Sequence, residues 1–221
     1  MAKSAKSKGT IVVVGAHPDD ETLGCGGAIA KRIKEGYEVA VVVLTDGDQL
    51  YSVVLKIHED PSPKEVARIR QEETRRSTRI LGVKPENVIF LSYGDGRLVE
   101  AIADATAALT RILEERRPVE VWSLSEYENH PDHVAASRIA RDACARVGGI
   151  RLLRYIVSLK SGTTLESVPL KFMPLDVSAY LPLKREAVKQ FQSHLGMLSK
   201  AQKAPIWKDA EAYLKPEELF A

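Results

Sequence analysis

Short runs of β-branched and aliphatic residues alternate along the chain with longer stretches of helical period, and this alternation limits the fold more than any other feature of the sequence. The clearest run is VAVVVL at 39–44, which carries no polar residue. Continuous apolar runs of this length are typical of strands buried on both faces, as in a parallel sheet covered by helices. The alternation therefore predicts an α/β protein with a mostly parallel central sheet between two layers of helices.

The boundaries of the expected elements follow from the glycines and prolines that interrupt the apolar patterns. The expected strands are Ile11–Gly15, Val39–Leu44, Val88–Leu91, Val119–Leu124 and Leu152–Ser158. The expected helices are Leu23–Glu35, Lys64–Leu81, about Glu100–Arg116, His133–Val147 and a last one around Leu183–Lys200. Residues 159–221 contain five prolines, and we expect them to form a C-terminal extension packed on the sheet.

Length and composition favour one globular domain. The chain has 221 residues, of which 44% are hydrophobic and 28% charged, so it can bury a full core. We expect a flexible N-terminal tail at residues 1–10 and a single domain at 11–221.

Charge and cysteine content exclude several classes of protein. The formal net charge of +2 provides no broad field for nucleic acid or an anionic membrane. The apolar run IVVVGA at 11–16 is too short for a secretory signal or a membrane span. The chain has only two cysteines, Cys25 and Cys144, which form neither a metal-type pair nor a secreted disulfide framework. These features predict a cytoplasmic protein with no nucleic-acid partner and no integral membrane segment.

Two polar loops follow the first and fourth expected strands. AHPDDE occupies 16–21, and EYENHPDH occupies 126–133. Ligands of open parallel sheets bind at the carboxyl ends of the strands, where strand order reverses. If the first and fourth strands are neighbours, as in the common 3-2-1-4-5 order, the two loops meet.

The side chains of these loops predict a metal site. His17 and Asp20 lie three residues apart, and His133 can approach them from the second loop, so two imidazoles and one carboxylate could bind Zn²⁺ or another divalent metal with a position left open for water. Asp19 could accept a proton from that water as it attacks a carbonyl. His130 could stay protonated and support the oxyanion or the leaving amine.

The same residues could instead have a purely structural role in polar loops with helix caps, because Asp19 and Asp132 are both suitable N-cap residues. Two His-Pro-Asp tripeptides after two different strands make coincidence improbable, and the functional reading is favoured.

AHPDDE, continued by TLGCGGAIA, and HPDH at 130–133 resemble the two signature motifs of the LmbE/PIG-L family of zinc-dependent N-acetylglucosaminyl deacetylases. The resemblance extends over roughly Ile11 to His194. It implies a Rossmann-like three-layer sandwich, a mononuclear Zn²⁺ and hydrolysis of an acetamide on an amino sugar. By motif position it implies metal ligands at His17, Asp20 and His133, with a general base at Asp19. His130 matches the family's histidine on the oxyanion side, and a homo-oligomer is plausible by the same resemblance.

Two weaker matches concern substrate binding. Arg70 resembles a family arginine that contacts substrate, and Asp95 in YGDGRL resembles an aspartate that receives a sugar hydroxyl. Arg70 could instead belong to a solvated arginine-rich helix face, and Asp95 to an ordinary turn.

Other positions remain open. Tyr127 lies one residue further from His130 than the tyrosine of some family members, and Ser193-His194 stands where the family often has Ser-Gln. The segment from Gly47 to Pro63 could be a lid over the pocket or a mobile loop. The glycines at 24, 26 and 27 fit close helix packing better than a phosphate loop.

These observations predict a metal-dependent hydrolase that removes acetate from an N-acetylglucosamine-type sugar or its conjugate. Water activated by the metal would attack the amide carbonyl, with Asp19 as general base. The alternative is a non-catalytic nucleotide- or sugar-binding module of Rossmann-like fold.

Overall fold

The computed structural model describes residues 7–208 and 210–221, whose strands form one sheet of order β3-β2-β1-β4-β5-β7-β6. The strands are β1 (Thr10–Gly15), β2 (Glu38–Thr45), β3 (Val88–Tyr93), β4 (Glu120–Leu124), β5 (Arg151–Tyr155), β6 (Met173–Asp176) and β7 (Glu217–Phe220). The first five pair in parallel, whereas β7 is antiparallel to both β5 and β6. The predicted α/β class and the 3-2-1-4-5 order are confirmed.

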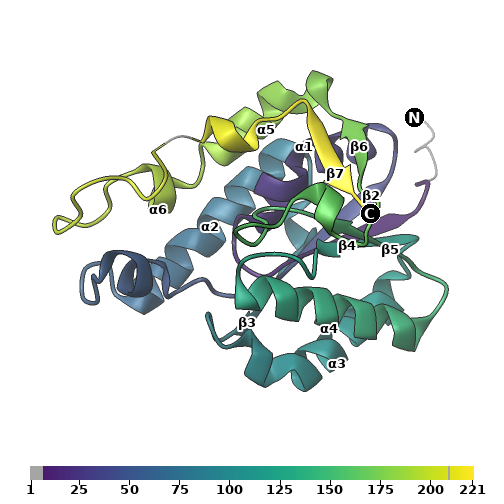
Figure 1. The fold of residues 1–221 in the computed structure, drawn as a ribbon, viewed down its shortest axis with the longest axis horizontal. Coiled ribbons are helices and arrows are strands. Elements are labelled where there is room, and N and C mark those ends of the chain that lie inside the picture. The colour runs from purple at the N-terminus through teal and green to yellow at the C-terminus, as the bar shows by residue number, and fades with distance from the viewer. Residues whose placement is uncertain (1–6, 209) are drawn as a thin grey trace.

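Helices cover both faces of the sheet (Figure 1). They are α1 (Asp20–Lys34), α2 (Pro63–Leu81), α3 (Ile102–Arg116), α4 (Pro131–Val147), α5 (Leu181–Val188) and α6 (Gln192–Leu195). Shorter helical turns are η1 (Leu50–Leu55), η2 (Pro85–Asn87), η3 (Leu98–Ala101), η4 (Leu165–Ser167), η5 (Ser178–Tyr180) and η6 (Glu211–Tyr213). α3 and α4 pack together on one face, and α1, α2 and α5 pack on the other. No helix in the described part of the chain is both long enough and apolar enough to cross a bilayer.

The core is the centre of this sandwich. The side chains of Ile11–Val14 in β1 and of Val41–Leu44 in β2 are fully buried. Both faces of these strands are covered, which is the environment that their continuous apolar runs predict.

The C-terminal extension differs from its predicted form. Instead of only packing on the sheet, it adds β7 and β6 to the edge beside β5. The single helix expected around Leu183–Lys200 is wrong, because α5 ends at Val188 and α6 is a separate short turn. Phe191 leaves helical geometry between them, and the Ser193 N–H donates to the Glu73 carboxylate of α2 instead of continuing a helix. Tertiary contacts therefore override the helical pattern.

The end of β5 also differs from the prediction, which extended it to Ser158. The N–H groups of Val157 and Ser158 donate to the Glu128 carboxylate at 2.7 and 2.8 Å rather than to a neighbouring strand. The strand therefore stops at Tyr155.

Residues 1–6 of the predicted tail lie outside the described residues. From Lys8 onward the backbone is hydrogen-bonded to the rest of the fold. The Lys8 N–H donates to Gly36 O, and Thr10 begins β1.

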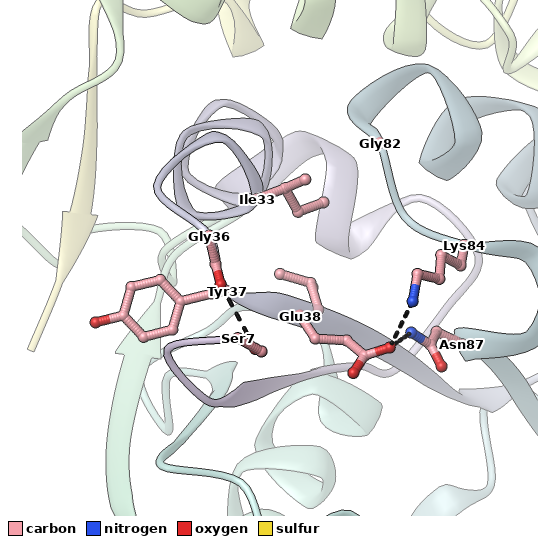
Figure 2. A pocket seen from close by; sticks show the side chains of 9 residues that line it. Ser7, Ile33, Gly36, Tyr37, Glu38, Gly82, Lys84 and Asn87 are labelled. Atoms are coloured by element: carbon pink, nitrogen blue, oxygen red, sulfur yellow. Dashed lines mark hydrogen bonds and ion pairs between the residues drawn. The ribbon is translucent and has the colours of Figure 1, made fainter. Parts of the chain in front are cut away.

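A hollow of about 280 Å³ lies beside this start, at the amino ends of β2 and β3 (Figure 2). Its polar groups bind one another, because the Glu38 carboxylate accepts from Lys84 at 3.2 Å and from Asn87 at 3.0 Å. Ligands of open parallel sheets bind at the opposite ends of the strands. The contacts of Glu38 therefore hold neighbouring segments together, and the hollow is not the candidate functional site.

Close helix packing accounts for the glycines of α1. A Cβ on Gly24 would lie 2.3 Å from the Tyr155 ring, and one on Gly27 would lie 2.8 Å from Val177. The expectation that these glycines serve packing agrees with this geometry.

A buried ion pair joins the extension to the same helix. Lys184 Nζ lies 2.6 Å from Glu218 Oε1 and donates to Leu23 O, while the two Glu218 oxygens accept from the N–H groups of Gly27 and Ala28. These contacts tie α5 and β7 to α1.

Replacing Glu218 by alanine should destabilise the protein by about 3–5 kcal/mol, because the Lys184 ammonium would remain buried without its counter-charge. Urea unfolding followed by circular dichroism measures the change. Glu217→Ala is the matched control, since Glu217 is exposed on the same strand. Equal unfolding midpoints for the two variants would contradict a stabilising role for the pair.

Candidate active site

The two polar loops meet at the carboxyl ends of β1 and β4, which pair directly. The first loop leads from β1 into α1 and carries His17, Asp19 and Asp20. The second leads from β4 into α4 and carries His130 and His133. The predicted neighbourhood of the first and fourth strands therefore brings all five side chains to one cavity.

His17, Asp20 and His133 converge. His17 Nδ1 lies 3.2 Å from His133 Nε2 and 3.7 Å from Asp20 Oδ2, and His133 Nε2 lies 3.2 Å from Asp20 Oδ1. Ligand atoms around a tetrahedral Zn²⁺ with bonds of about 2.0–2.1 Å are about 3.3 Å apart. The donor types and their spacing therefore fit a divalent metal.

A second combination uses His130. One nitrogen each from His17, His130 and His133 lies within 4.8 Å of the others. Asp20 is buried and makes the shorter contacts, whereas His130 is exposed. The geometry favours Asp20 as the third ligand and leaves His130 beside it.

Carboxylates orient the two histidines from behind. Glu128 Oε2 lies 3.1 Å from His133 Nδ1, while Asp95 Oδ1 and Asp132 Oδ2 lie 3.1 and 3.4 Å from His17 Nε2. Metal-binding histidines commonly donate their other N–H to a carboxylate, which sets the tautomer and the ring orientation.

The charge balance of the cluster favours a cation. Burial lowers the pKa of His17, yet hydrogen bonds to Asp132, Asp20 and Asp95 raise it well above its ordinary value overall. For His133, burial likewise lowers the pKa, but Asp20 and Glu128 raise it to about 9. Both imidazoles thus lie in a field that stabilises positive charge, and a bound metal would replace their protons.

Asp19 faces a different environment from Asp20. Its φ is 137°, a positive value that is uncommon for a residue other than glycine. Its Oδ2 accepts from Arg70 Nη2 at 3.1 Å and lies 3.3 Å from His194 Nε2. Burial raises the pKa of Asp19 to about 7 despite the nearby guanidinium. The two adjacent carboxylates are therefore separated, one toward the histidine pair and the other toward α2 and the C-terminal extension.

The structure places Arg70 and Asp95 on the cavity wall, with most of their polar atoms directed to protein groups. Arg70 donates to Gly47 O at 2.7 Å and to Pro18 O at 2.9 Å as well as to Asp19. Asp95 contacts His17 and accepts from the Gln49 N–H at 2.9 Å. In this geometry Arg70 holds Asp19 and Asp95 orients His17, and substrate binding by either residue stays a prediction.

The surroundings of His130 disfavour its protonated form, and a cationic role for His130 stays a prediction. Burial and the neighbouring His17 and His133 lower its pKa, which favours a neutral ring. Its Nδ1 accepts the Asp132 N–H at 3.2 Å, so the ring proton is on Nε2. The Asp132 carboxylate is directed to His17 and accepts from the N–H groups of Gly96 and Leu98.

The role of Glu128 as the partner of His133 was not predicted from the sequence, and the role of His194 was left open. His194 stacks on Trp207 with ring centroids 4.1 Å apart, and its Nδ1 lies 3.1 Å from Ser193 Oγ, which donates to Glu73 at 2.6 Å. The scarcity of histidine is a sequence signal that points to His194. The chain has only five histidines, and four of them line this cavity.

The segment at 47–63 takes part in the cavity wall. η1 contributes Leu50, Val53 and Val54 to the lining, and Tyr51 is buried with its hydroxyl donating to Ser193 O at 2.9 Å. Trp207 and Tyr213 of the extension line the same cavity, which has a volume of about 580 Å³. The site is thus completed by segments far from the two motifs.

Replacing Glu128 by glutamine should lower metal affinity by about 10–100-fold. The amide loses the charge behind His133 and keeps only one of the two oxygens that accept separately from the Val157 and Ser158 N–H groups. Competition with a fluorescent zinc chelator measures the change. Glu126→Gln in the same loop is the control, since Glu126 contacts Arg154 and not the histidines. Equal affinities in the two variants would exclude the orienting role.

The fold and the site define the class as a Rossmann-like α/β protein with a histidine- and carboxylate-rich site at the carboxyl ends of its strands. Residues 12–144 match the family model described as PIG-L: GlcNAc-PI de-N-acetylase, and the chain belongs to this family. The predicted resemblance is confirmed.

Individual relatives cover most of the chain. The Escherichia coli K12 protein named uncharacterized deacetylase YaiS is 27% identical over 87% of this chain and 96% of its own length. The N,N'-diacetylchitobiose deacetylase of Pyrococcus horikoshii, solved with an inhibitor, has a TM-score of 0.70 and 25% identity over 96% of this chain and 82% of its own. GalB, the 4-carboxy-2-hydroxymuconate hydratase of Pseudomonas putida KT2440, has a TM-score of 0.68 and 25% identity over 83% and 78% of the two chains.

Proposed function

We propose that this protein is a metal-dependent hydrolase that removes the acetyl group from an N-acetylglucosamine-type amino sugar or its conjugate. The observation that carries the proposal is the convergence of His17, Asp20 and His133 beside a second buried carboxylate, Asp19, in one cavity. Family membership and the diacetylchitobiose deacetylase support deacetylation in particular. They favour an enzyme over the alternative of a non-catalytic binding module.

His17, Asp20 and His133 would hold Zn²⁺ or another divalent metal. When bound, the metal would polarise the acetyl carbonyl and make a neighbouring water molecule more acidic.

Asp19 would handle the proton. Its carboxylate would accept a proton from the attacking water and return it to the nitrogen of the departing amine. A pKa of about 7 suits a group that must both accept and release a proton near neutral pH. Arg70 and His194 hold the carboxylate in place from the other side.

His130 would stabilise the negative charge that develops on the carbonyl oxygen. Because its Nδ1 already accepts the Asp132 N–H, its Nε2–H is the group available to donate to that oxygen. The donor in this step would be a neutral imidazole, whereas the sequence predicts an imidazolium.

The direct test is release of free amine and acetate from N-acetylglucosamine, its methyl glycosides and N,N'-diacetylchitobiose by the Zn²⁺-loaded protein. Equimolar amine and acetate, absent with His17→Ala, would support the proposal. Because the fold also carries a hydratase, acetate itself must be measured. No amine above the His17→Ala background with zinc, cobalt or manganese would exclude it.

We also propose a small-molecule amino-sugar ligand without a nucleic-acid partner, a homo-oligomer and a cytoplasmic location. Light scattering after gel filtration tests the oligomer, and cell fractionation tests the location.

A further inference from the structure

The cavity continues beyond the catalytic side chains to an apolar rim, defined by Leu50, Val53 and Val54 of η1. Val53 is 58% exposed and Val54 56%, although both belong to a cavity wall. Aliphatic side chains left open at a cavity mouth are a recognised mark of a ligand-binding surface.

The rim is a built part of the site. Tyr51, between the rim residues, is buried and bonded to Ser193, and the Gln49 N–H just before η1 donates to Asp95, which orients His17. The rim is thus held by Ser193, which precedes His194 of the cavity, and by Asp95, which contacts His17.

The polar side chains of Gln49 and Ser52, next to the rim residues in sequence, are already engaged. The Gln49 side-chain oxygen accepts from Ser52 at 2.9 Å, and its amide nitrogen donates to Asp48. The rim therefore presents mainly carbon to a ligand, which suits an alkyl or aryl group better than a second sugar with its many hydroxyls.

We infer that the rim binds an apolar group attached to the amino sugar, so that the preferred substrate is an N-acetylglucosaminide with an alkyl or aryl aglycone. This inference rests on the proposed function for the acetamide end. The side chains around Asp19 and His130 would bind the acetamide, and Leu50, Val53 and Val54 would cover the apolar aglycone. Because the rim and these side chains line one cavity, the group on the rim is part of the same substrate.

The test compares kcat/KM for both anomers of hexyl N-acetylglucosaminide with the values for N-acetylglucosamine and N,N'-diacetylchitobiose. The hexyl glycoside is used below its micelle concentration. We expect an advantage of about tenfold or more for one hexyl anomer, since several methylenes leave water. The double variant Val53→Asn/Val54→Asn should bring this ratio close to one. Val99→Asn is the matched control, because Val99 is 60% exposed on η3 and does not line the cavity.

Binding separates this inference from the proposed function. Hexyl glucoside, which has no acetamide, should change the tryptophan emission through Trp207, which lines the cavity, whereas Trp122 is buried. The affinity should be at least about tenfold weaker in the double variant. Binding of this kind without any deacetylation would reject the proposed function and keep the apolar subsite. Deacetylation with equal kcat/KM for hexyl and unsubstituted sugars, or binding that the double variant leaves unchanged, would overturn the apolar subsite.

Discussion

Replacing Asp19 by asparagine is expected to lower kcat by roughly 10²–10⁴-fold, the contribution typical of general acid–base catalysis. The amide has the shape of the carboxylate but cannot take a proton from the attacking water. Because Asp19 contacts Arg70 and His194 rather than the histidine pair, metal content should be unchanged. Single-substrate kinetics and elemental analysis of the same preparation measure both quantities.

The thermal unfolding midpoint of Asp19→Asn is the control. The loss of turnover counts as catalytic only if the variant is folded and holds its metal. A variant that retains metal and reaches the wild-type kcat would remove Asp19 as general base and leave the metal site in place.

Removing a ligand should have a different effect. His17→Ala and Asp20→Asn are each expected to weaken metal binding by more than about 100-fold, because loss of an outer partner alone costs about 10–100-fold. Asp20 also accepts the N–H groups of Ala16 and His17, so its replacement loosens the loop as well. Zinc titration by calorimetry measures the affinities.

His58→Ala is the matched control for these variants, because His58 is exposed and does not line the cavity. His130→Ala separates the two candidate ligand sets. If His130→Ala loses its metal while Asp20→Asn keeps it, the three-histidine combination is the ligand set.

Much of the fold was predictable because its information is local. The β1 and β2 strands are continuous apolar runs in the sequence. Gly36 ends the helical pattern of α1, and Gly82 ends that of α2. The parallel order followed from general rules of α/β sheets. The C-terminal region was less predictable because Phe191 and Ser193 take their conformations from contacts with distant residues such as Glu73.

The same distinction applies to the site. The AHPDDE and HPDH motifs identified the side chains that meet, since each motif is contiguous and follows a strand. Glu128 was missed because its role depends on where His133 points, and His194 was left open because its neighbour Asp19 is distant in sequence.

The sequence by itself determined the α/β class, the family and the side chains that could bind a metal, because apolar periodicity and short motifs are encoded by neighbouring residues. Only the tertiary structure decided that Asp19 and Asp20 face different partners, that Arg70 holds Asp19, and that η1 and Trp207 complete the cavity. These properties arise from contacts between segments far apart in the chain, and their energetics depend on burial, which no local pattern specifies.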